Sequence, residues 1–163
     1  MVSYGGAQTN LTNTGTMTGR IGFGASTPGN TFVNAGTING SVHLGNSGAI
    51  GNTFTAVSGS NVVNLGTGVA GAFGGLGISL AAAGVVDAGT GTNDRLVLQN
   101  SATGPGSGSG GAATTLDWTR YTNFEQLTVN SGTWNVLGTS TAQPPSMMAW
   151  STSTTAACSA RAC

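Results

Sequence analysis

A short motif recurs near the start of the chain at an offset of 21 residues, and this repeat constrains the fold more than any other feature. Residues 11–24, LTNTGTMTGRIGFG, and residues 32–45, FVNAGTINGSVHLG, agree at their glycines, at an asparagine and at several apolar positions. One such unit cannot bury its own apolar face, whereas stacked units bury a continuous core. The repeat therefore predicts an all-β chain folded as a right-handed parallel β-helix, a solenoid with about 21 residues per coil.

Apolar residues alternate within each repeat, as they do in a strand with one buried face. The pattern directs three pairs of side chains inward, in two stacked rows: Ile21 and Phe23, Val42 and Leu44, and Val63 and Leu65. The residues between them are expected to face outward: Gly22, His43 and Asn64. Val63 and Leu65 belong to a looser third copy of the repeat. A β-sandwich is the alternative, but two copies that agree at glycines and apolar positions favour the solenoid.

Glycine and asparagine mark the corners of the expected coils, because such corners need a positive φ. Asn13 lies 21 residues before Asn34, so the two side chains are candidates for a hydrogen-bonded ladder. The phrase Asn-Thr-Phe at residues 30–32 recurs at residues 52–54, which places one extra residue in the intervening turn. The whole chain is expected to make about six coils, a stalk of roughly 30 Å.

The second half of the chain has a different texture. Residues 96–98 read as a strand, and residues 104–111, GPGSGSGG, read as a flexible surface loop. Four later residues are inward candidates: Leu127, Val129, Trp134 and Val136. The apolar run at residues 69–86 is long enough for a membrane-spanning segment to be considered. Its glycines and alanines favour a solenoid coil or a short helical excursion instead.

Charge is scarce, and its distribution limits the possible partners. Charged residues make up 5% of the chain, against about 25% in typical globular domains. The positive charges are four scattered arginines, with no lysine. We therefore expect no nucleic-acid partner and no polybasic membrane contact, since both depend on clustered positive charge. No membrane span is expected in this chain.

Candidate catalytic and metal-binding residues are few and stand apart in the sequence. His43 is the only histidine, and we expect it to be a solvated surface residue. Glycoside hydrolysis needs two paired carboxylates. The acidic residues of this chain occur singly in the sequence: Asp87, Asp94, Asp117 and Glu125. Residues 89–96, GTGTNDRL, echo one calcium-binding nonapeptide, but a single copy cannot complete such a site. We predict no catalytic, cofactor-binding or metal-binding residue, and no cofactor.

One later phrase resembles a known family. Residues 121–129, YTNFEQLTV, are followed by Ser-Gly-Thr-Trp at 131–134 and Leu-Gly at 137–138, and residues 91–98, GTNDRLVL, precede them. This order is similar to that of bacterial autotransporter passenger domains, the exported part of type V secretion proteins. The resemblance implies an extracellular or cell-surface location and a structural or adhesive stalk that displays loops for adhesion or aggregation. The alternative is a carbohydrate-active enzyme, a polysaccharide lyase or glycosidase, on a β-helix.

The resemblance also bears on the two ends of the chain. It implies a C-terminal outer-membrane β-barrel in the full-length protein, missing from this fragment, and a ligand on a host or bacterial surface. The first ten residues lack the features of a signal peptide, so a signal is expected upstream. We predict a β-solenoid over residues 1–138. Residues 139–163 are predicted to be a poorly ordered low-complexity tail whose two cysteines, Cys158 and Cys163, brace nothing.

Overall fold

The computed structural model describes residues 1–64, 66, 68–103 and 113–138. This part of the chain is all-β, with parallel sheets and a single turn of 3-10 helix, η1 (Trp118–Arg120). The all-β prediction is confirmed. The predicted loop at 104–111 and the predicted tail at 139–163 lie outside the described residues.

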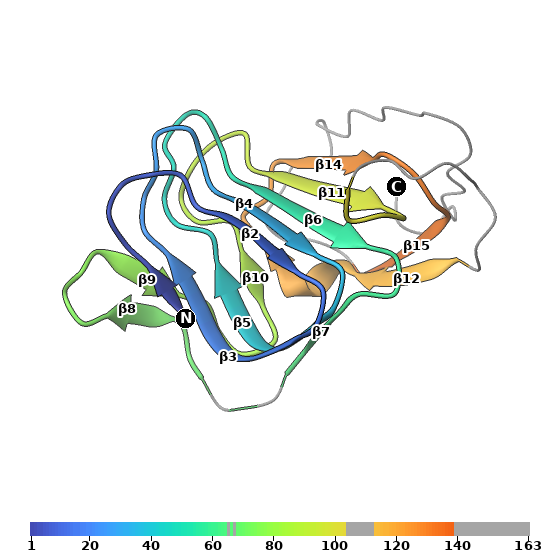
Figure 1. Ribbon diagram of the computed structural model, residues 1–163, viewed down its shortest axis with the longest axis horizontal. Helices are drawn as coiled ribbons and strands as arrows, with labels where there is room; N and C mark the ends of the chain where they lie inside the picture. The colour runs from blue at the N-terminus through green and yellow to red at the C-terminus, as the bar shows by residue number, and fades with distance from the viewer. Residues whose placement is uncertain (65, 67, 104–112, 139–163) are drawn as a thin grey trace.

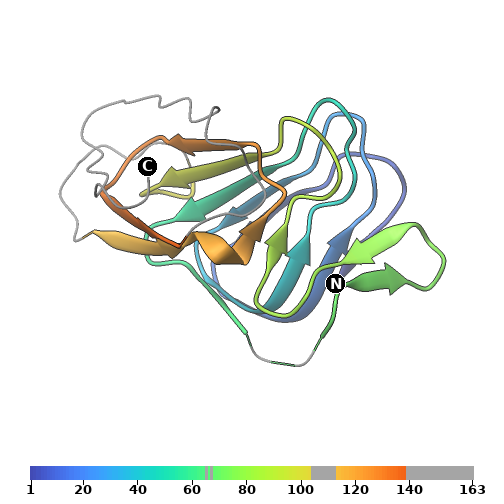
Figure 2. The same ribbon diagram turned by 180° about the vertical axis from the view of Figure 1, so that it is seen from behind.

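Two parallel sheets share the chain, which passes back and forth between them (Figure 1). The first sheet contains five strands in sequence order: β2 (Asn10–Asn13), β4 (Thr31–Asn34), β6 (Thr53–Val57), β11 (Arg95–Gln99) and β14 (Gln126–Val129). The second sheet contains six: β1 (Val2–Ser3), β3 (Thr16–Phe23), β5 (Thr37–His43), β7 (Asn61–Val63), β10 (Val86–Asp87) and β13 (Tyr121–Thr122). Figure 2 shows the same alternation from behind.

Two further pairs of strands lie outside these sheets. β12 (Thr114–Asp117) pairs in parallel with β15 (Trp134–Leu137), and β8 (Gly71–Phe73) forms an antiparallel hairpin with β9 (Ile78–Leu80). The strand predicted at residues 96–98 is confirmed, since it lies within β11. Trp134 is buried, and Leu127, Val129 and Val136 pack against the core, which confirms all four as inward residues.

The spacing between paired strands of the first sheet begins at the predicted period and then lengthens. Paired residues are 21 apart from β2 to β4 and 22 apart from β4 to β6. The next two steps, to β11 and then to β14, are 42 and 31 residues. The early repeat is therefore regular, and later steps carry insertions that leave the pairing intact.

The predicted rows of the second sheet are right for two layers and wrong for the third. Ile21 pairs with Val42, as the offset predicts. Val63 pairs instead with Asn39, and the partner of Val42 on its other side is Val86. The physical reason is that the chain leaves this sheet after β7 and returns only at β10. Val86 therefore fills the place that a strict period would give to Val63, and Leu65 lies outside the described residues.

A line of aromatic side chains runs through the core, across the layers. Ring centroids are separated by 6.1 Å from Phe23 to Phe32, 5.3 Å from Phe32 to Phe54 and 5.8 Å from Phe54 to Tyr121. Phe124 continues the line at 6.3 Å from Tyr121. Tilted and edge-on pairs at these separations add to the free energy of burial. The layers are thus joined by side-chain packing as well as by backbone pairing.

The chain leaves the second sheet after β7, and β9 packs on the outer face of that sheet. A Cβ added at Gly22 would lie 2.9 Å from the side chains of Ile78 and Leu80, so only a residue without one fits under β9. Arg20 Nη2 donates to the carbonyls of Val69 at 2.6 Å and Ala81 at 2.8 Å. The prediction of a coil or a short helical excursion over 69–86 is wrong, because the glycines at the tip allow a tight antiparallel hairpin instead. Across the described ranges, no helix is long and apolar enough to cross a membrane.

Candidate functional site

Buried and partly buried polar side chains stack in the corner where the chain passes from the second sheet to the first. The backbone N–H of Thr9 donates to Asn30 Oδ1 at 2.8 Å, and that of Asn30 donates to Asn52 Oδ1 at 2.7 Å. The N–H of Asn52 donates to Asp94 Oδ1, and that of Asp94 donates to Glu125 Oε2 at 2.7 Å. We call Asn30, Asn52, Asp94 and Glu125 the corner ladder. Each member satisfies a backbone donor of the preceding layer.

The two asparagines of the corner ladder also donate from their amide nitrogens. Asn30 Nδ2 donates to the carbonyls of Gly24 at 2.9 Å and Leu44 at 2.7 Å, and Asn52 Nδ2 donates to those of Gly45 and Ala88, both at 2.8 Å. Both residues are fully buried. Because a buried amide without partners costs free energy, these contacts account for two asparagines in the core.

A second, shorter ladder lies at the opposite corner. Asn13 Nδ2 donates to Asn34 Oδ1 at 2.8 Å, and both side chains are buried. Each of the two also accepts, from the N–H of Gly15 and of Gly36 respectively. The ladder predicted from the 21-residue offset is therefore confirmed.

Asp94 is the exception in the corner ladder, because one of its oxygens is not matched. The residue is 0% exposed, and its Oδ2 is buried without a hydrogen-bond partner. Burial raises the pKa of Asp94 to about 6, against hydrogen bonds from Asn52 that lower it, and the nearby Glu125 and Asp87 raise it further. Asp94 thus combines complete burial with a carboxylate oxygen that has no hydrogen-bond partner.

His43 is buried, so the prediction of a solvated surface residue is wrong. Its side chain is 5% exposed, because β5 runs between β3 and β10 and because the ring turns into the corner. There Nδ1 accepts the N–H of Gly45 at 3.0 Å. Burial lowers the pKa of His43, and the neighbouring Asp87 opposes that shift. His43 therefore serves the corner as a hydrogen-bond acceptor.

The sequence suggested that the acidic residues stand apart, but two of them lie together in the structure. Asp94 and Glu125 meet in the corner ladder, although 31 residues separate them. Asp87 accepts from the N–H of Gly89 at 2.9 Å and from Asn123 Nδ2 at 2.8 Å. The sequence contains a signal for the corner ladder. Each member is the first residue of a triplet that ends in an apolar residue: Asn-Thr-Phe at 30–32 and 52–54, Asp-Arg-Leu at 94–96 and Glu-Gln-Leu at 125–127.

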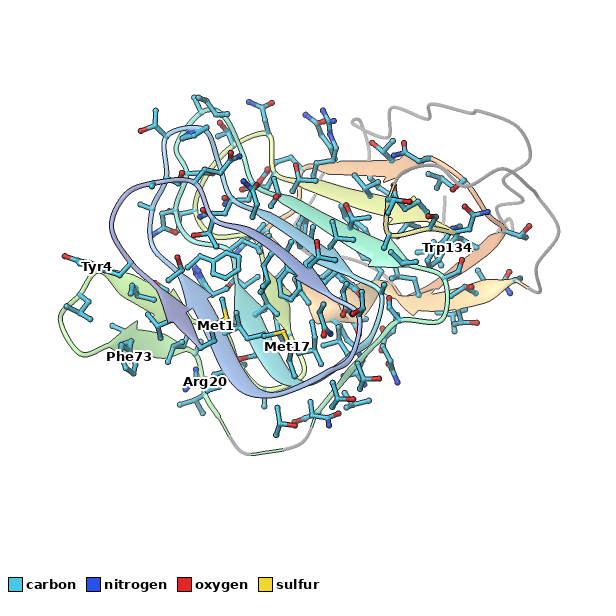
Figure 3. All side chains as sticks on the ribbon, viewed as in Figure 1. Met1, Tyr4, Met17, Arg20, Phe73 and Trp134 are labelled. Atoms are coloured by element: carbon cyan, nitrogen blue, oxygen red, sulfur yellow. The ribbon has the colours of Figure 1, made fainter. Side chains whose placement is uncertain are left out.

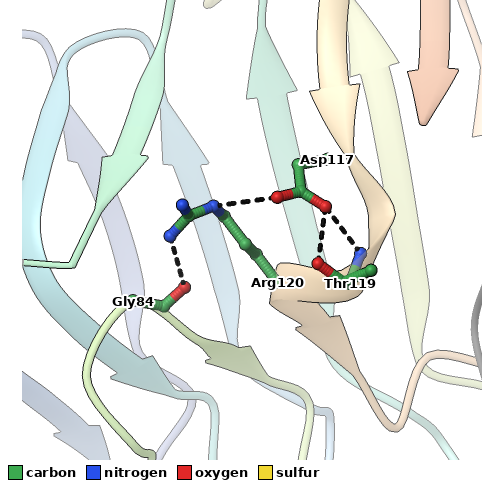
Figure 4. Close-up of polar contacts among 4 residues, drawn as sticks. All are labelled: Gly84, Asp117, Thr119 and Arg120. Carbon is green, nitrogen blue, oxygen red and sulfur yellow. Dashed lines mark hydrogen bonds and ion pairs between the residues drawn. The ribbon is translucent and has the colours of Figure 1, made fainter. Parts of the chain in front are cut away.

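Asp117 lies apart from the corner ladder, beside η1 (Figure 4). It forms an ion pair with Arg120 at 3.3 Å, and its Oδ1 accepts from the hydroxyl of Thr119 at 2.6 Å. The Thr119 hydroxyl and the other contacts lower the pKa of Asp117. Arg120 Nη1 also donates to the carbonyl of Gly84 at 3.4 Å. Arg120 thus connects Gly84 to the layer that contains η1.

A small cleft opens between β7 and β12, where the two strands do not pair. It has a volume of about 110 Å³, and its lining includes Asn61, Asp117, Arg120, Tyr121 and Trp134. Ligand pockets usually measure about 300–1,000 Å³, so this cleft fits water or a very small group. The indole of Trp134, placed in Figure 3, donates to the carbonyl of Ser131 at 2.9 Å and is buried.

Metal ligands are not gathered in the part of the chain that the structure describes. No group of three or more histidine, cysteine, aspartate or glutamate side chains is placed to hold a metal ion there. The calcium-like phrase at 89–96 contributes Asp94 to the corner ladder. Cys158, Cys163 and the Gly/Ser run at 104–111 lie outside the described residues.

Comparison with protein-family models, with curated proteins and with solved structures finds no match. The functional conclusion therefore depends on the geometry of this chain and on the sequence resemblance.

Proposed function

We propose that this chain is a segment of a right-handed parallel β-helix that serves as a structural and adhesive stalk at a cell surface. The observation that carries the proposal is the in-register parallel pairing of five successive strands, from β2 to β14, in one sheet. Between each two of these strands the chain forms a strand of the second sheet, as it does in each coil of a β-helix. The right hand follows from the strong preference of parallel crossover connections.

The interior supports a role in architecture. Aromatic and aliphatic side chains fill the space between the sheets, and the buried asparagines satisfy backbone groups of neighbouring layers. Asp94, the acid with the most perturbed pKa, is inaccessible to a polymer substrate because it is 0% exposed. We therefore propose a stalk without catalytic activity, of the autotransporter passenger type, located outside the cell.

The hairpin at β8 and β9 is the proposed adhesive element. Val69 is 77% exposed, Phe73 44% and Leu76 45%, so three large apolar side chains are exposed in and next to the hairpin. Figure 3 places Phe73 on the hairpin, away from the two sheets. Residues 68–85 contain no charged side chain. Exposed apolar patches of this kind are typical of interaction sites.

Surface display tests the adhesive role. The chain is fused to an outer-membrane carrier, and cell sedimentation and attachment are compared with those of the carrier alone. We expect the wild-type chain to increase both, and the double variant Phe73→Ser, Leu76→Ser to return them to the carrier level. Ile50→Ser, an exposed apolar residue away from the hairpin, is the matched control and should leave both unchanged. No difference between the wild-type chain and the carrier would contradict the proposal.

Incubation with a panel of acidic and neutral polysaccharides tests the absence of catalysis. We expect no release of reducing ends and no unsaturated product. Turnover that disappears in Glu125→Gln would contradict the stalk and favour a carbohydrate-active enzyme on the same fold.

A further inference from the structure

The corner ladder changes chemistry at its third step. Asn30 and Asn52 each place a side-chain oxygen toward the preceding layer and an amide nitrogen toward two carbonyls. At Asp94 an oxygen, Oδ2, replaces that nitrogen. Asp94 Oδ1 still accepts from the N–H of Asn52, so the ladder continues on that side. The difference is confined to Oδ2, which can donate only when it carries a proton.

The register shows which backbone groups surround this step. Gly45 stacks on Gly24, and Gly89 stacks on Gly45, since a Cβ on the later glycine would meet the earlier carbonyl. A neighbouring row is formed by Leu44, Ala88 and Asn123, because Asp87 pairs with His43 on one side and Thr122 on the other. Continued by one layer, the two rows bring Gly89 and Asn123 to the level of Asp94.

Gly91 passes close to this part of the corner ladder. A Cβ at Gly91 would lie 2.8 Å from Ser47 Oγ, 3.1 Å from Asp94 Oδ2 and 3.1 Å from the carbonyl of Gly48. Ser47 Oγ, like Oδ2, is buried without a hydrogen-bond partner. An ionised carboxylate in such a setting would be desolvated, and no hydrogen bond from the Ser47 hydroxyl would offset that cost.

The charged groups around Asp94 do not compensate its charge. Glu125, which follows β13, and Asp87 on β10 both disfavour ionisation of Asp94. His43 on β5 interacts with Asp87 and is itself buried. Arg95, the next residue in the chain, directs its Nε to Gln126 Oε1 at 3.3 Å. Arg120 forms an ion pair with Asp117, beside η1.

We propose that Asp94 carries a proton in the folded chain under mildly acidic conditions and completes the corner ladder as a donor, so that the stack contains a proton-dependent latch. Loss of this proton leaves a buried charge among carbonyls and loosens the corner that joins β10 to β11. The latch goes beyond the stalk function and does not depend on it.

The direction of the pH effect follows from the raised pKa. A carboxyl group that holds its proton more tightly in the folded state stabilises that state fully below its unfolded pKa of about 4. This contribution is lost as the pH rises through about 6, the pKa in the folded chain. His43 acts in the opposite direction: its lowered pKa gives stability that is lost as the pH falls below about 6.5. The test therefore needs a readout specific to Asp94.

Carboxyl ¹³C NMR of the intact chain gives that readout. We expect the Asp94 resonance to titrate with a midpoint near pH 6, and a midpoint below about 4.5 would overturn the proposal. In parallel, Asp94→Asn supplies the donor permanently. Its folding equilibrium should match that of the wild type near pH 4 and exceed it by up to roughly a hundredfold at pH 8.

A transplant variant provides the matched control. Asn52→Asp in the Asp94→Asn background moves the carboxyl one layer along the corner ladder, and it should restore the loss of stability with rising pH. An equal pH profile for the single and double variants would count against the latch. Calcium and magnesium are also added at pH 8: if either stabilises the wild type but not Asp94→Asn, a cation rather than a proton neutralises this carboxylate, and the proposal is overturned.

Discussion

At the scale of single residues, close stacking of backbones determines which side chains are allowed. Gly36 lies over Gly15, and Gly40 lies over Gly19, with added Cβ atoms only 2.0 Å and 1.9 Å from the carbonyl oxygens below. Gly15 occupies the same position of the repeat at the open end of the stack, where an added Cβ would meet nothing within 4 Å. The repeated glycines are thus required by the layer beneath them.

This pair of glycines gives a prediction with a built-in control. Gly36→Ala should lower the free energy of unfolding by about 3 kcal/mol or more, because the methyl group meets backbone that cannot rotate away. Gly15→Ala should change it by less than about 1 kcal/mol. Chemical denaturation of the two variants measures both. Equal destabilisation would show that the layers do not stack as described.

At the scale of elements, the strands that repeat and the strands that depart from the repeat were not equally predictable. The offsets that join β2, β4 and β6 could be deduced from Asn-Thr-Phe and from the matched glycines. The pairing of Val42 with Val86 could not, because 44 residues separate them and the intervening hairpin obeys no period. His43 was misplaced for a related reason: alternation describes a strand in isolation and omits the strands and corner groups that cover it.

The hairpin combines an exposed strand, β8, with a strand, β9, that is buried at Ile78 and partly buried elsewhere, so the two strands should respond differently to truncation. Ile78 is 1% exposed and packs over Gly22. Ile78→Ala should therefore lower the free energy of unfolding by about 2–4 kcal/mol. Phe73→Ala, on the exposed strand, should cost less than about 0.5 kcal/mol. Thermal or urea unfolding distinguishes these outcomes. A large loss for Phe73→Ala would place that ring in a packed interface.

At the scale of the whole molecule, contacts of several kinds join the layers. Backbone pairing, the line of aromatic rings and the two ladders all run across the layers, and each joins residues distant in sequence. The general architecture was predictable because period and alternation are properties of the sequence alone. Asp94 and its unmatched oxygen were not, because the chemistry of that site arises only when layers separated by 42 and 31 residues come together.

The through-space contacts of Val42, measured by NMR on the intact chain, test the stacked architecture most directly. We expect backbone contacts from Val42 and its flanking residues to Ile21 and its neighbours on one side, and to Val86 and its neighbours on the other. Contacts from Val42 to Val63, or the absence of contacts to β3 and β10, would show that the strands do not stack in this order.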